Sequence, residues 1–146
     1  MIQINEFRKT LKSVIETQIN AECHFVLTFS MVNALNIHDE YAAIVHILRT
    51  QEMEWRQCNP RYKIAVYLGV RDSEAESEVK GEISQWAKAD ILLNIAYNVV
   101  HAIYADDNMK ILDVGSYTYH DEIEGVTTKD YLWTQLPMEI QWITKS

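Results

Sequence analysis

The stretch that decides the fold is RYKIAVYLGVR, at residues 61–71. Its side chains alternate between two sets, and apolar residues dominate the first set. The first set comprises Tyr62, Ile64, Val66, Leu68 and Val70, and the second comprises Lys63, Ala65, Tyr67, Gly69 and Arg71. Alternation over this length predicts a β-strand that buries its first set against a core.

Two segments with helical periodicity flank this strand in the chain. Residues 5–19 place Phe7, Leu11 and Ile15 at i, i+4 and i+8, which predicts an amphipathic helix. Residues 83–103 repeat apolar side chains at i+4 steps, which predicts a long helix that covers the sheet and ends at the polar residues 106–108. Its stripe comprises Ile83, Ala87, Ile91, Ile95, Val99 and Ile103.

Residues 23–32, 41–48, 110–120 and 131–144 are predicted to be further strands, because they are rich in β-branched and aromatic side chains. Consecutive strands without crossover helices favour antiparallel pairing. No linker or internal repeat divides the chain. The sequence therefore predicts a single α+β domain over residues 1–146. It has a mostly antiparallel sheet of about five strands, an N-terminal helix and a long helix packed on the sheet.

The composition narrows the classes of partner. The formal net charge is −8, and the 13 Lys and Arg residues never form a run. Nucleic-acid binding needs clustered cations to neutralise phosphates. We therefore expect no specific nucleic-acid binding.

The chain shows no signal for export or membrane insertion. Its start, MIQINEFRKTLKSVIE, has neither the apolar region nor the cleavage site of a secretory signal. No segment approaches the roughly 20 apolar residues of a membrane span. Cys23 and Cys58 lack a CxxC spacing, so we expect reduced thiols in the cytoplasm, with a single disulfide as the alternative.

No motif for a catalytic, cofactor or metal site is present in the sequence. The histidines do not show metal-ligand spacing, no nucleophile motif occurs, and the glycines are scattered. The most chemically suggestive cluster is His120, Asp121 and Glu122, which could bind a divalent ion or transfer protons. Adjacent residues of a strand point to opposite faces, so we favour a solvated loop end and predict no enzyme.

The last predicted strand carries the candidate contact residues. Pro137 cannot donate to a strand ladder, so this strand is expected to lie at an edge or to be bulged there. Trp133 and Trp142 are separated by nine residues and therefore lie on opposite faces. We expect one of the two to be exposed, and an exposed Trp often marks an interface.

The element order and several phrases resemble small phage tail-completion proteins, of the tail-terminator and head–tail connector type. The phrases are FSMVNALN at residues 29–36, residues 41–47, residues 61–70 and the ending LPMEIQWI. In that family an N-terminal helix precedes a small sheet, a second helix packs on the sheet, and paired strands end the chain. The resemblance covers most of the chain in pattern and transfers no functional residue.

The resemblance implies a structural protein without enzymatic activity or cofactor. Copies would form a homo-oligomeric ring, such as a hexamer or dodecamer, that caps the tail tube or joins it to the head. Other tail or neck proteins would be its partners, and the protein would be made in the host cytoplasm and assembled into the virion. Edge strands expose unpaired backbone groups. The expected contacts are therefore Trp133, Pro137 and Trp142 on the last strand, with Glu124 and Lys129 in the loop at residues 121–130.

Two alternatives remain open at the level of sequence. An acidic inhibitor or immunity-type module would bind a basic protein partner through its charge and aromatic surface. An enzyme of a different type would use His120 and nearby carboxylates. The first alternative predicts a stable one-to-one complex, and the second predicts loss of function when His120 and Glu122 are substituted.

Overall fold

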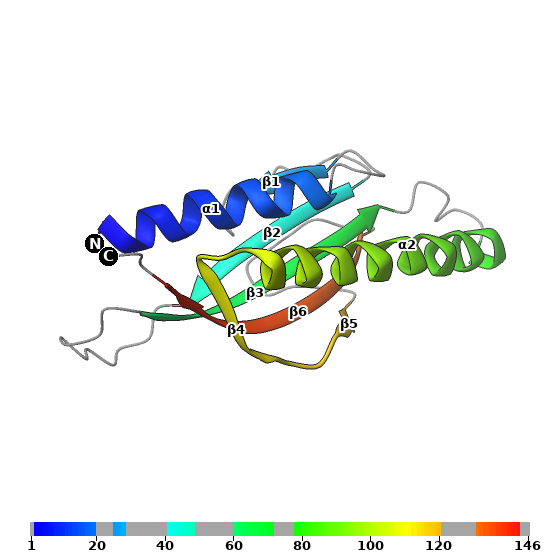
Figure 1. Ribbon diagram of the computed structural model, residues 1–146. Coiled ribbons are helices and arrows are strands. Elements are labelled where there is room, and N and C mark those ends of the chain that lie inside the picture. The colour runs from blue at the N-terminus through cyan, green and yellow to red at the C-terminus, as the bar shows by residue number, and fades with distance from the viewer. Residues whose placement is uncertain are drawn as a thin grey trace.

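The computed structural model describes residues 2–19, 25–28, 41–48, 60–71, 78–120 and 131–143 (Figure 1). The elements in chain order are α1 (Ile2–Ile19), β1 (Phe25–Thr28), β2 (Tyr41–Leu48), β3 (Arg61–Arg71), α2 (Glu78–Ala105), β4 (Met109–Val114), β5 (Thr118–His120) and β6 (Tyr131–Trp142). The predicted α+β class is confirmed. The first helix begins at Ile2, earlier than predicted, and the polar residues after Ala105 end the second helix as predicted.

The described strands form one sheet in the order β1-β2-β3-β6-β4, and β5 pairs with β6 beside β4. All pairs are antiparallel except β1 with β2, which is parallel, so the predicted, mostly antiparallel sheet is confirmed. The predicted edge position of the last strand is wrong, because β6 lies between β3 and β4. β3 pairs with β2 along one edge and with β6 along the other, so β6 satisfies the backbone hydrogen bonds of its second edge.

The single strand predicted at residues 110–120 is also wrong, because it is divided into β4 and β5. Pro137 explains the break. The backbone N–H of Gly115 donates to the carbonyl oxygen of Pro137 at 2.8 Å. The N–H and C=O of one strand residue point to the same side. The missing N–H of Pro137 therefore lies where β4 has ended and β5 has not begun. The predicted bulge of β6 at Pro137 is wrong, because β6 pairs with β3 in continuous register there and the register shift lies in β4, between Ile111 and Asp113.

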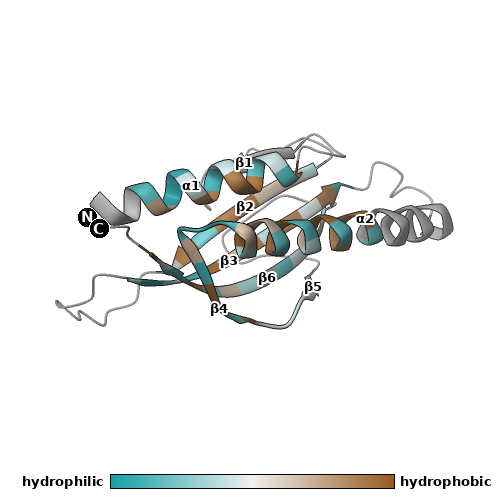
Figure 2. Cartoon of the chain, viewed as in Figure 1, coloured by the Kyte–Doolittle hydropathy of each residue, from teal (hydrophilic) through white to brown (hydrophobic). Residues whose placement is uncertain are grey.

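Both helices cover the same face of the sheet (Figure 1). The helices contact each other, α1 also contacts β1, and α2 contacts β3, β4 and β6. Figure 2 shows the hydrophobic side of α1 turned towards the sheet. The buried residues of this main core are Phe7, Leu11, Ile15, Ile19, Ala43, Val45, Ile64, Val66, Leu68, Val70, Leu92, Ile95, Ala96, Val99, Ile103, Met109, Leu136, Met138, Ile140 and Trp142.

A second, smaller cluster lies on the other face of the sheet, which carries none of the described helices. It consists of Ala42, Ile44, Tyr131 and Trp133, with Tyr67 packed against it. A Cβ atom added to Gly69 would lie 2.5 Å from Cε3 of Trp133. Only glycine leaves room for the indole ring at this position in the adjacent strand.

Candidate interaction surfaces

The two tryptophans proposed as contact residues are both buried. Trp133 has no exposed surface and Trp142 is only 4% exposed. They lie on opposite faces, as predicted, but the expectation that one is exposed is wrong. The Trp133 ring stacks on Tyr131 with centroids 5.2 Å apart. Phe7 meets the Trp142 ring edge-on at 6.0 Å, so both indoles are part of the packing of the monomer.

The remaining predicted contact residues have different outcomes. Pro137 is half-buried and lies opposite Ala65 in the centre of the sheet. Glu124 and Lys129 lie outside the described residues, as do both cysteines. The structure therefore does not bring the five predicted contact residues together in one described surface.

The cluster His120, Asp121 and Glu122 is described only at its first member. His120 pairs with Trp133 in the sheet, and its Nε2 lies 2.7 Å from Oγ1 of Thr118. This contact gives the imidazole a partner at the edge of the sheet. Within the described residues, His, Cys, Asp and Glu form no group of three that could hold a metal ion.

The face of the sheet that carries none of the described helices, which we call the helix-free face, holds a shallow groove of about 300 Å³. Ala65, Gly115 and Pro137 form part of its floor, and their small or compact side chains leave the space. Charged groups of both signs line it, from Lys63, Asp113 and Glu139. Lys63 and Asp113 each pair with Glu139 across the sheet, which places the acidic and basic groups in one cross-strand row.

The large exposed apolar side chains of the described residues lie elsewhere, on α2 and on the β4–β5 side. Tyr104 is 78% exposed and Tyr97 is 59% exposed. Val114 and Tyr119 are exposed by 42% and 44%. α2 packs against β4, which carries Val114, and β5, which carries Tyr119, pairs with β6 beside β4. We call Tyr97, Tyr104, Val114 and Tyr119 the tyrosine edge.

Helical spacing explains why α2 carries this surface. Leu93, Tyr97, Val100 and Tyr104 follow at i, i+4, i+7 and i+11, which places them on one flank of the helix. The buried stripe with Ile95, Val99 and Ile103 lies next to it. Sequence reasoning did not identify the two tyrosines. The available signal was aromatic side chains on a helix outside its main apolar stripe.

Tyr117 packs under the same edge. Its ring meets that of Tyr119 edge-on, with centroids 5.5 Å apart. Its hydroxyl is buried without a hydrogen bond of good geometry to the described residues. Burial raises the pKa of Tyr117 to about 12, and the neighbouring Thr134 hydroxyl offsets only part of that increase. The phenol therefore stays neutral and acts as packing.

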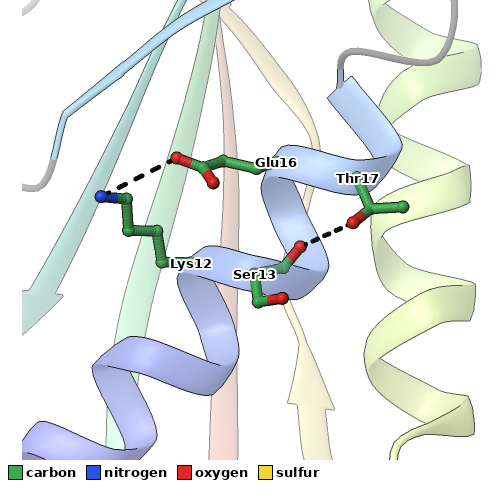
Figure 3. Close-up of polar contacts among 4 residues, drawn as sticks. All are labelled: Lys12, Ser13, Glu16 and Thr17. Atoms are coloured by element: carbon green, nitrogen blue, oxygen red, sulfur yellow. Dashed lines mark hydrogen bonds and ion pairs between the residues drawn. The ribbon is translucent and has the colours of Figure 1, made fainter.

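The exposed side of α1 carries a different chemistry. Lys12 and Glu16 form an ion pair at 3.8 Å, and their side chains are 55% and 43% exposed. Figure 3 shows both on the flank of α1 that points away from α2, whereas Thr17 lies on the side nearer α2. The Thr17 hydroxyl donates to the backbone oxygen of Ser13 at 2.9 Å. Arg8 and Lys9 are exposed one turn before Lys12.

Neither described helix has a stretch that is long and apolar enough to cross a lipid bilayer. No protein-family model matches the chain, and no curated protein matches its sequence.

Proposed function

We propose that this chain is a non-enzymatic virion assembly protein that forms a ring with copies of itself at the end of a phage tail or at the head–tail junction. The ring caps the tail tube or joins it to the head. The protein is made in the host cytoplasm and acts in the assembled particle. Its partners are further copies of the same chain and other tail or neck proteins.

The order of elements supports this proposal. An N-terminal helix precedes three strands, a long helix then packs on the sheet, and paired strands follow. This is the order that the resemblance to tail-completion proteins implies. Element order alone is an analogy between folds, since one fold can serve many functions.

The observation that carries the proposal is the tyrosine edge. Exposed tyrosines on neighbouring elements are typical of protein interfaces, because the rings supply large contact areas with few rotatable bonds. The edge lies at one end of the strand order, where a strand has backbone groups available for a neighbour. A surface of this kind suits protein contacts better than small-molecule chemistry.

The experiment is a measurement of mass in solution. The purified chain is studied by light scattering and native mass spectrometry over a range of concentrations, alone and with the neighbouring tail proteins. We expect a closed oligomer of defined copy number in at least one of these conditions. A chain that stays monomeric in all of them would contradict the proposal, and a one-to-one complex with a basic protein would favour the inhibitor-type alternative.

A further inference from the structure

The two ends of the sheet differ in chemistry. The tyrosine edge lies at the β4–β5 end, and α1 lies at the opposite end, where it runs along β1 and β2 (Figure 1). The two surfaces therefore face away from each other across the width of the sheet. A ring made of identical copies needs two different surfaces of this kind, related so that the rotation closes.

The β4–β5 end combines aromatic and acidic groups. Asp107 is exposed in the turn after α2, Asp113 is exposed on β4 where it lines the groove of the helix-free face, and Asp106 is partly buried. The carboxylate of Asp106 accepts a hydrogen bond from the backbone N–H of Asn108 at 2.9 Å, which fixes the turn into β4. Lys110 is the exposed cation of this segment. The three carboxylates outnumber the single lysine, so the net charge of residues 106–113 is negative.

The outward flank of α1 has the opposite balance. Lys9, Lys12 and Glu16 follow at i, i+3 and i+7 and therefore share one side of the helix. Arg8 lies one turn before Lys12 and adds a further positive charge. We call Arg8, Lys9, Lys12 and Glu16 the α1 flank. Its positive balance stands out in a chain whose net charge is −8.

We propose that the tyrosine edge of one copy docks on the α1 flank of the next copy, head to tail around the ring. This inference rests on the proposed function and names the two surfaces of its contact. Carboxylates at the β4–β5 end meet the lysines of α1, and opposite charges across an interface set register and orientation. The exposed rings of Tyr97 and Tyr104 provide aromatic faces over which cationic side chains bind.

The test uses two variants that each remove one surface. Lys9→Glu with Lys12→Glu reverses the α1 flank, and Tyr97→Ala with Tyr104→Ala removes the aromatic rings from the edge. All four positions are exposed, so both variants should fold, which circular dichroism checks. At concentrations where the wild type is a ring, we expect each variant to be monomeric, with self-association weakened at least tenfold.

Mixing the two variants distinguishes this contact from others. Each chain keeps one working surface, so the mixture should form a one-to-one heterodimer and no ring. Recovery of the full ring from the mixture would overturn the proposal. A chain that carries Lys9→Glu, Lys12→Glu, Asp107→Lys and Asp113→Lys exchanges the charges between the surfaces and should assemble again.

The control is Arg61→Glu, which reverses a charge on the exposed, helix-free face outside the row of Lys63, Glu139 and Asp113. It should assemble like the wild type. If the wild type forms rings and both surface variants form them equally well, this contact is wrong and the proposed function stands. If the wild type never assembles, the proposed function itself fails.

Discussion

The two faces of the sheet bury a tryptophan each, but by different means. Trp142 lies under the helices and contacts Phe7, which in turn stacks on Tyr62 at 4.4 Å. Trp133 lies on the face without a described helix, stacked on Tyr131 and fitted against Gly69. Trp142 is buried because a layer of helices packs over it, whereas Trp133 fits against the neighbouring strand because Gly69 has no side chain. A missing Cβ atom can thus make room for a buried aromatic ring on a face that carries none of the described helices.

The largest expected effect is the loss of either indole. Trp142→Ala and Trp133→Ala should each lower the free energy of unfolding by about 3–5 kcal/mol, because each leaves a large cavity. Substitution of each tryptophan by phenylalanine should lower the stability by different amounts on the two faces. The buried Nε1 of Trp142 has no hydrogen-bond partner among the described residues, so Trp142→Phe removes an unfavourable buried donor and should cost only about 1 kcal/mol.

Urea denaturation followed by circular dichroism measures these values. Trp133→Phe is the matched comparison and should cost more than Trp142→Phe, because a smaller ring leaves the space over Gly69 unfilled. Equal costs at both positions would show that the two faces bury their rings in the same way.

An intermediate effect is expected at Gly69. Gly69→Ala places a methyl group against the Trp133 ring and should cost about 1–3 kcal/mol, since the rigid indole cannot move aside easily. In the Trp133→Ala background the same substitution should be neutral or stabilising. A double-mutant cycle should therefore give a coupling energy of about 2 kcal/mol. Additive effects would show that Gly69 is not the residue that makes room for the ring.

The smallest effect is expected at alkaline pH and concerns Tyr117, whose ring packs against Tyr119. The pKa of Tyr117 is raised from 10.0 to about 12, first by burial and further by the nearby Tyr119. The folded chain keeps a proton that the unfolded chain loses, so this contribution to stability is complete below pH 10. It falls as the pH rises from 10 to about 12.

Thermal unfolding between pH 10 and 12 tests this dependence. Tyr117→Phe should flatten the decrease in Tm and should change stability at neutral pH by only about 0.5 kcal/mol, because the lost hydroxyl lacks a good partner. Tyr97→Phe, at an exposed tyrosine, is the control and should keep the wild-type slope. An unchanged slope in Tyr117→Phe would contradict the raised pKa.

Periodicity predicted most of the fold, because the elements bury one regular face. The alternation at residues 61–71 places Ile64, Val66, Leu68 and Val70 in the core as predicted. In the described part of the α2 stripe, Ile95, Val99 and Ile103 are buried in the core and Ile91 packs against it. The position of β6 could not be predicted in this way. Period and composition identify a strand, but strand order depends on pairing between segments far apart in the chain. The missing N–H of Pro137 led us to predict an edge strand, although an internal strand can also accommodate a proline. Its missing donor lies at a local break in the ladder of an internal strand.

The contact residues were less predictable for a related reason. An exposed Trp was expected on β6, but both indoles are buried. Trp133 is accommodated because Gly69 in the adjacent strand has no side chain. Whether a large ring is buried depends on the residue opposite it, and that residue lies in another strand. The tyrosines of α2 needed only helical geometry. Their exposure nevertheless depends on where α1 and the sheet leave α2 uncovered.

The internal position of β6 also affects how the chain folds during synthesis. β6 follows every other strand of the sheet in the chain, yet it joins β3 to β4 and β5. While the ribosome is still making residues 131–142, β3 lacks its second neighbour and the helices lack much of the surface on which they pack. Such long-range pairing delays the closing of the core until this strand has emerged. A growing chain therefore exposes apolar surface until β6 has been made, and chaperones can bind this surface during that interval.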